Sequence, residues 1–223
     1  MWVKICANTS LEDAMTAAEA GADAVGFVFA ESVRKVTPAQ VRAITPHLPA
    51  SVEKIGVFVD ARFDDLAAAI EGCGLTGVQL HSSCEAGAAA RLRERFGSLR
   101  ILRVIHFQNG LERELREAQA DEAIDAVLVD SRTAHLVGGT GIRFDWQAAR
   151  GSFAGSRLRM VTAGGLNPEN VGEAIAMLRP WGVDVASGVE AAPGKKDAAK
   201  VRAFVEAARI AARKLKLDAA VEV

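Results

Sequence analysis

Short apolar runs recur along the chain at near-regular intervals, and apolar residues repeat at helical spacing in several stretches between them. Such runs are typical of buried strands, and their alternation with amphipathic helices predicts a parallel sheet. Eight units of this kind predict an α/β fold, a closed (β/α)8 TIM barrel. The predicted strands are residues 3–6, 24–29, 52–59, 77–81, 101–106, 126–130, 159–164 and 183–188. Predicted helices include 11–20, 38–47, 64–73 and 169–178.

The length of the chain limits the number of domains. A chain of 223 residues fits one small barrel, and no linker or low-complexity tract divides it. We therefore expect residues 1–223 to form a single domain. Residues 215–223 are expected to form a tail that frays beyond the last helix.

The composition of the chain limits the classes of molecule that it is expected to bind. A net charge of −1, with no basic stripe, argues against nucleic acid as a partner. No stretch approaches the ~20 apolar residues that span a bilayer, so no membrane association is expected. Three cysteines without metal-ligand spacing fit a reducing, cytoplasmic location. The sequence leaves open whether the protein is a monomer or a homodimer.

Polar residues at the strand ends are the candidates for chemistry, because a barrel of this kind places its active site at the carboxyl ends of its strands. Lys4 and Cys6 share one face of the first strand, while His81 and Asp130 end the fourth and sixth. Asp184 interrupts the last apolar run. Lys4 is expected to lower the pKa of the Cys6 thiol and favour its thiolate. The alternatives are an internal Lys4–Asp184 ion pair and a Cys6 that is merely a small buried apolar residue.

Glycine-rich segments follow the predicted strands late in the chain, at 138–141, 163–166 and 187–190. Glycine lets backbone N–H groups approach a phosphate, and loops after the last two strands of such barrels often bind one. Each segment alone could be a tight turn, but together they predict a phosphorylated small-molecule ligand. The expected phosphate-binding residues are Gly141, Gly164, Gly165, Ser187 and Gly188. Asn167 and Pro168 predict the N-cap and first position of the next helix.

Taken in order, several motifs resemble those of the phosphoribosylanthranilate isomerase family of tryptophan biosynthesis, nearly from end to end. The motif that ends the first strand is Val-Lys-Ile-Cys, and the one that ends the sixth is Leu-Val-Asp-Ser. The matching segments are residues 3–6, 21–29, 32–36, 56–59, 78–81, 128–131, 138–141, 163–166, 183–190 and 193–197. Their joint order is specific, whereas each motif alone is weak.

The resemblance implies an enzyme that catalyses the Amadori rearrangement of N-(5-phosphoribosyl)anthranilate to 1-(2-carboxyphenylamino)-1-deoxyribulose 5-phosphate. It implies Asp130 as general acid and Cys6 as general base. We expect Arg34 to bind the anthranilate carboxylate, because a guanidinium pairs with a carboxylate in a planar, bidentate way. Further substrate-binding residues are expected at Lys4, His81 and Asp184. No metal or organic cofactor is expected, since the reaction leaves the redox state unchanged.

Two alternatives stay open at this point. One is a phosphate-binding regulatory barrel without catalysis, and the other is the related amino-sugar phosphate isomerase of histidine biosynthesis. The latter enzyme has an Asp where this chain has Cys6. The chain also departs from the family pattern, with Ala7-Asn8-Thr9 where Gly-x-Thr usually follows the Cys, and Ser82-Ser83 where Gly usually follows the His.

Overall fold

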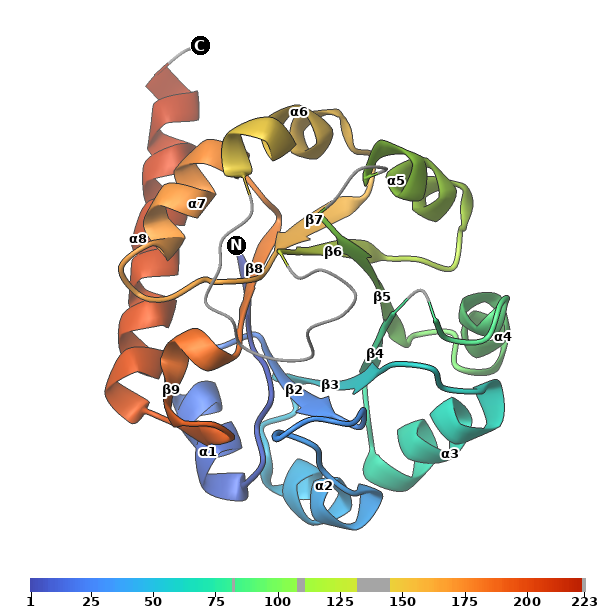
Figure 1. The fold of residues 1–223 in the computed structure, drawn as a ribbon. Helices are drawn as coiled ribbons and strands as arrows, with labels where there is room; N and C mark the ends of the chain where they lie inside the picture. Colours follow the sequence, from blue (N-terminus) through green and yellow to red (C-terminus); the bar gives the residue numbers. More distant parts are fainter. Residues whose placement is uncertain (82, 108–110, 132–144, 222–223) are drawn as a thin grey trace.

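The computed structural model describes residues 1–81, 83–107, 111–131 and 145–221. Within these ranges, eight parallel strands pair in chain order and close into a barrel, with helices around it (Figure 1). The strands are β1 (Trp2–Ile5), β2 (Ala24–Val28), β3 (Glu53–Phe58), β4 (Gly77–Leu80), β5 (Arg100–His106), β6 (Ala126–Asp130), β7 (Arg159–Thr162) and β8 (Gly182–Val185). The predicted TIM barrel is confirmed.

The helices outside the barrel include those predicted from helical spacing, with bounds that shift by one to three residues. They are α1 (Leu11–Glu19), α2 (Pro38–Ile44), α3 (Phe63–Cys73), α4 (Ala88–Arg95), α5 (Leu111–Ala120), α6 (Trp146–Gly155), α7 (Val171–Leu178) and α8 (Ala198–Val221). The largest shift is at the helix predicted over 38–47, which ends at Ile44 and is followed by a 3₁₀ turn, η1 (Thr45–His47). Polar caps fix several starts: the side chain of Ser10 caps α1, and Thr37 forms a capping box with Gln40 before α2. In the described ranges no helix has both the length and the apolarity that a membrane span needs.

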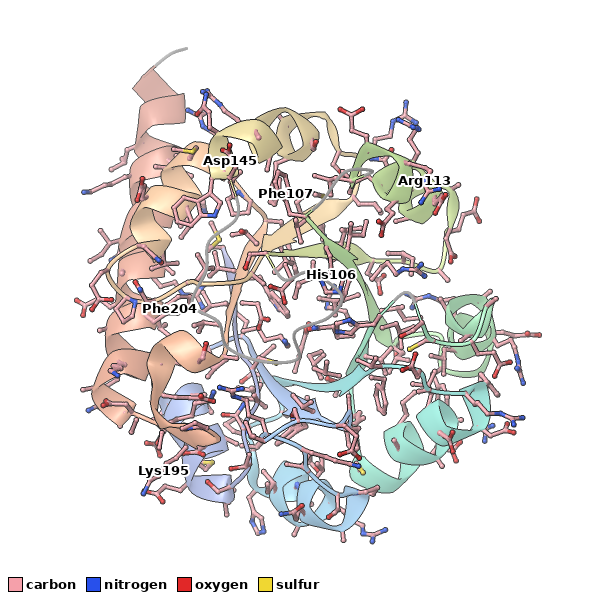
Figure 2. The ribbon with its side chains drawn as sticks, in the orientation of Figure 1. His106, Phe107, Arg113, Asp145, Lys195 and Phe204 are labelled. Atoms are coloured by element: carbon pink, nitrogen blue, oxygen red, sulfur yellow. The ribbon has the colours of Figure 1, made fainter. Side chains whose placement is uncertain are left out.

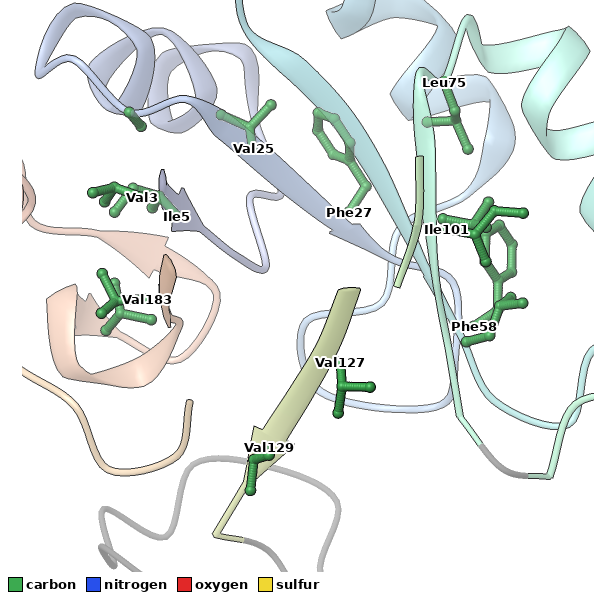
Figure 3. Close-up of a cluster of buried hydrophobic side chains, with 14 of the residues drawn as sticks. Val3, Ile5, Val25, Phe27, Phe58, Leu75, Ile101, Val127, Val129 and Val183 are labelled. Atoms are coloured by element: carbon green, nitrogen blue, oxygen red, sulfur yellow. The ribbon is translucent and has the colours of Figure 1, made fainter. Parts of the chain in front are cut away.

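Each strand has two buried faces, because one side points into the barrel and the other toward the helices. The outer shell of apolar side chains forms the larger core, part of which is shown in Figure 3. The inner core consists of Trp2, Ala24, Ile55, Leu102, Val104, Ala126, Leu128, Val161 and Ala163. At its amino-terminal end, Trp2 stacks on Trp181 with ring centroids 5.1 Å apart. Apolar packing thus fills the lower barrel and leaves polar side chains to the carboxyl end.

Helix α8 contacts the first residues of the chain. It lies along α7 and α1, and buries Phe204 against the outer shell (Figures 1 and 2). The Arg209 guanidinium donates to the carbonyls of Met1 and Gly21 and pairs with Asp23 at 2.8 Å. Residues 215–221, expected as a fraying tail, instead continue α8 to Val221, so that expectation is corrected.

The last two strands end earlier than predicted. β7 stops at Thr162 and β8 at Val185, whereas the apolar runs extend to 164 and 188. Gly164 and Gly165 take φ values of +79° and +65°, which strand geometry does not allow. Ser187–Val189 form a 3₁₀ turn, η2. Both segments therefore leave the barrel as loops.

Helix α7 also begins later than predicted, at Val171 with Asn170 as its N-cap. The carboxamide oxygen of Asn167 accepts the N–H groups of Glu169 and Asn170, both at 3.0 Å. Asn167 therefore stabilises a turn ahead of the helix instead of capping the helix itself. Pro168 belongs to that turn and not to α7.

The backbone after β1 bends sharply at Ala7, whose φ is +62°. This left-handed conformation costs an L-residue about 1–2 kcal/mol, while glycine adopts it freely. Ala7 stands at the position where the resembling family usually has Gly. Alanine at this position therefore leaves the backbone strained, directly beside Cys6.

We predict that Ala7→Gly raises the free energy of unfolding by about 1 kcal/mol, because the relieved strain exceeds the added freedom of the unfolded chain. Ala68→Gly is the matched control, since Ala68 is exposed in the middle of α3 and the same change there should cost about 1 kcal/mol. Urea unfolding followed by circular dichroism measures both. Equal destabilisation by the two changes would contradict the strain at Ala7.

Candidate active site

A buried lysine lies at the centre of the polar end of the barrel. Lys4 has no exposed surface, and its ammonium donates to Gln79 Oε1 and Asp184 Oδ1, each at 2.9 Å. The register of β1 on β8 sets Lys4 opposite Asp184, so the pair follows directly from barrel closure. Burial alone would lower the pKa of Lys4, but Asp184 and Cys6 raise it above its ordinary value. The ammonium is therefore charged.

Cys6 follows β1 on the same inward face as Lys4, as its spacing predicted, and is 6% exposed. Gly26 on β2 makes room for it: a Cβ there would come within 2.7 Å of Cys6 Sγ and 3.0 Å of Lys4 Cε. Burial raises the pKa of the Cys6 thiol, with Asp184 adding to the rise, and Lys4 only partly offsets this. Burial therefore outweighs the lowering of the thiol pKa that was expected from Lys4.

Arg34 is 8% exposed and is held by a carboxylate of the chain itself. Its Nε donates to Glu190 Oε1 at 2.8 Å and its Nη2 to Glu190 Oε2 at 2.7 Å. Burial would raise the pKa of Glu190, but Arg34 and Lys196 hold it below its usual range. The edge of the guanidinium formed by Nε and Nη2 is therefore occupied by Glu190.

The hairpin of β9 (Glu190–Ala192) and β10 (Lys195–Lys196) follows η2. Strand alternation exposes Lys195 and buries Lys196, whose ammonium lies 3.3 Å from Glu190 Oε1 and 3.1 Å from the carbonyl oxygen of Ala186. Figure 2 shows Lys195 at the periphery of the molecule. One carboxylate thus holds two buried cations.

Asp130 ends β6, is 9% exposed, and lies against the loop after β7. A Cβ on Gly164 would come within 2.6 Å of Asp130 Oδ1 and 2.1 Å of Ser131 Oγ, so only glycine fits there. The register of β5 on β6 pairs His106 with Asp130, and Figure 2 shows His106 toward the centre of the barrel. The ring of His106 faces that of His81 at a centroid distance of 5.5 Å. The buried Nδ1 of His106 has no hydrogen-bond partner within the described residues.

The loops after β7 and β8 touch through their backbones. A Cβ on Gly188 would come within 1.9 Å of the carbonyl oxygen of Leu166, which excludes any side chain at this position. Gly164, Gly165, Ser187 and Gly188 are all partly exposed, so their backbone groups can reach a ligand. The structure therefore brings these expected residues together, whereas Gly141 lies outside the described residues.

Sequence reasoning did not assign to the site several residues that the structure places in or beside it: Gly26, Gln79, His106, Glu190 and Lys196. Gly26 sits within an apolar run and gives no chemical signal. Glu190 and Lys196 lie beyond the last predicted strand. The alternation of Lys195 and Lys196 in a short strand was the available signal for the latter.

Known proteins with related sequences share this architecture. A family model described as N-(5′-phosphoribosyl)anthranilate (PRA) isomerase matches residues 3–207. The isomerase of Pelobacter propionicus is 42% identical over 208 residues, which cover 93% of this chain and 95% of that protein. A Bacillus cereus isomerase is 43% identical over 205 residues, covering 92% and 96%.

Solved structures agree. The phosphoribosylanthranilate isomerase of Thermotoga maritima superposes with a TM-score of 0.82 at 37% identity, covering 94% of this chain and 98% of that one. A structure of such an enzyme in complex with reduced 1-(o-carboxyphenylamino)-1-deoxyribulose 5-phosphate superposes with a TM-score of 0.79 at 36% identity, with the same coverage. These findings favour neither the regulatory barrel nor the histidine-pathway isomerase. The chain belongs to the N-(5′-phosphoribosyl)anthranilate isomerase family, the enzymes of tryptophan biosynthesis.

Proposed function

We propose that this chain isomerises N-(5′-phosphoribosyl)anthranilate by general acid–base catalysis, with Asp130 as the acid and Cys6 as the base. The observation that carries this proposal is the placement of both groups at the carboxyl end of the barrel strands: Cys6 directly follows β1 and Asp130 ends β6. Proton transfer by positioned groups of this kind contributes about 10²–10⁴-fold each to a rate. The acid and the base lie far apart in the sequence. The fold brings both to the carboxyl end of the barrel strands.

The reaction begins when Asp130 gives its proton to the ring oxygen of the ribose. The C1–oxygen bond breaks, the ring oxygen becomes the C4 hydroxyl, and the amine nitrogen and C1 form a protonated Schiff base. The Cys6 thiolate then takes the proton from C2, and the electron pair forms a C1–C2 double bond that neutralises the nitrogen. This enolamine tautomerises to the C2 ketone: the C2 hydroxyl loses its proton as its oxygen becomes the carbonyl, and C1 gains a proton. Atoms and electrons are conserved, so the step is an isomerisation.

Arg34 is proposed to bind the carboxylate of the anthranilate ring. Glu190 fixes the guanidinium through Nε and Nη2, so the Nη1–Nη2 edge can meet the ligand without reorganisation. His81 and Asp184 are proposed to line the sugar site. Lys4 has no exposed surface, so its proposed role moves from substrate contact to an electrostatic one beneath Cys6.

The phosphate is proposed to bind the touching loops after β7 and β8, through Gly164, Gly165, Ser187 and Gly188. The absence of side chains at these glycines lets backbone N–H groups converge on an anion. Gly141 is proposed as a further ligand on its sequence alone. A cytoplasmic location is also proposed, and the three free thiols support it.

We predict that Cys6→Ala and Asp130→Asn each lower kcat by about two decades or more while the fold is kept, because each removes one proton-transfer group. Loss of substrate fluorescence, with the substrate generated from anthranilate and phosphoribosyl pyrophosphate, measures turnover. Cys73→Ala is the matched control, since Cys73 is a buried thiol that donates to the carbonyl of Pro38 away from the site. Turnover near that of the control in either site variant would reject its assignment.

The pH dependence follows from the raised pKa of Cys6. The base acts as thiolate, and burial shifts thiolate formation to higher pH, so kcat/KM is expected to rise as pH increases through neutrality. Because kcat/KM reports ionisation of the free enzyme, the midpoint of this rise is that of Cys6 in the empty site. A profile that is flat from neutral to alkaline pH would contradict Cys6 as the base.

We predict that Arg34→Lys raises KM about tenfold or more with a smaller change in kcat, because a lysine cannot keep both the Glu190 contact and a planar ligand contact. Lysine retains the charge that Glu190 needs, which protects the fold. Lys35→Gln is the neighbouring control, since Lys35 is exposed and pairs with Glu31 at the surface. An unchanged KM in Arg34→Lys would exclude Arg34 from binding.

A further inference from the structure

Lys196 is a buried cation that the proposed reaction does not use. Its side chain is 1% exposed, although its neighbour Lys195 lies at the surface. Burial lowers the pKa of Lys196, while Glu190 and Cys6 oppose that effect. A lysine is among the residues most rarely buried, because its charge loses hydration. Its position therefore calls for a role beyond packing.

The ammonium of Lys196 lies at the end of β8, next to the residue that holds the backbone of Cys6. The N–H of Cys6 donates to the carbonyl of Val185 at 2.7 Å, and the ammonium of Lys196 donates to the carbonyl of the next residue, Ala186, at 3.1 Å. Cys6 and Lys196 thus meet the same short stretch at the end of β8. The pKa of Cys6 responds accordingly, since Lys196 joins Lys4 in opposing the rise that burial causes.

Lys196 belongs to a set of buried charges at this end of the barrel. Within the described residues, and besides Asp130, the set holds three cations and three carboxylates: Lys4, Arg34, Lys196, Asp13, Asp184 and Glu190. Asp13 accepts the backbone N–H of Lys196 at 3.2 Å, whereas Glu190 contacts its ammonium. In a site of low dielectric, cations held in this way act more strongly on a thiolate than they would in water.

We propose that Lys196 is a positioning residue for the isomerisation: held by Glu190 and the Ala186 carbonyl, its ammonium stabilises the Cys6 thiolate together with Lys4. The proposal rests on the proposed function of Cys6 as the base. Glu190 then serves two ends of the substrate, because the same carboxylate fixes Arg34 for the anthranilate group and Lys196 for the proton transfer.

The test is a direct titration of the Cys6 thiol in the free protein. In a Cys73→Ala/Cys84→Ala background, Cys6 is the one remaining thiol, and the chain contains no tyrosine whose ionisation would overlap the ultraviolet absorbance of a thiolate. We expect Lys196→Met to move the midpoint of this titration up by about one pH unit. The same change should lower kcat/KM at neutral pH about tenfold and shift its pH profile equally.

Matched variants separate charge from structure. Lys196→Met leaves Glu190 paired with Arg34, so it is expected to fold, and Lys196→Gln serves in its place if circular dichroism shows otherwise. Lys196→Arg keeps the charge and should restore the midpoint. Lys200→Met is the control, because exposed Lys200 contacts the backbone carbonyl of Glu190 rather than its carboxylate. It should leave the titration unchanged.

The outcomes distinguish this inference from the function on which it rests. An unchanged Cys6 titration in a folded Lys196→Met protein overturns the role of Lys196, whether or not turnover falls. Full turnover in Cys6→Ala overturns Cys6 as the base, and the thiolate titration, made without substrate, still reports on Lys196. An upward shift that Lys196→Arg reverses supports the proposal.

Discussion

The buried ion pair between Lys4 and Asp184 is the interaction on which the rest of the site depends. It joins the first strand to the last where the two pair to close the barrel, and Gln79 completes it from a third strand. An unpaired charge in this position would cost several kcal/mol, so removing one partner threatens the fold as well as the chemistry. The pair also sets the field in which Cys6 ionises. Stability and reactivity at the barrel mouth are therefore two results of one contact.

Sequence pattern predicted the barrel and the inward-facing Lys4, Cys6, Asp130 and Asp184, because strand parity fixes which side chains converge. It could not predict that burial outweighs Lys4 at the thiol, since desolvation depends on the whole surrounding shell. It did not predict the pairing of Arg34 with Glu190, because nothing local to Arg34 reveals a carboxylate 156 residues away along the chain. The last strands ended early for a similar reason, as close backbone approach across loops leaves no mark in hydropathy.

Glycine governs the mouth of this barrel through contacts more than through turns. Gly26 leaves space for a sulfur atom, Gly164 for a carboxylate and Gly188 for a carbonyl oxygen of the neighbouring loop. At each of these positions, an added methyl group would clash with the neighbouring atom and displace it. Ala7 shows the opposite case, a methyl group retained where the backbone favours none. The local geometry of the site is thus set by the smallest side chains in it.

The chain order of the barrel has a consequence for how the protein folds. Lys4 lies 180 residues before Asp184, and Arg209 of the last helix holds the carbonyl of Met1. During folding, the ion pair and the field around Cys6 cannot form before β8 pairs with β1. A chain that stops short of β8 leaves one edge of β1 unpaired and lacks the carboxylate that holds Lys4. The site is therefore completed only when the barrel closes.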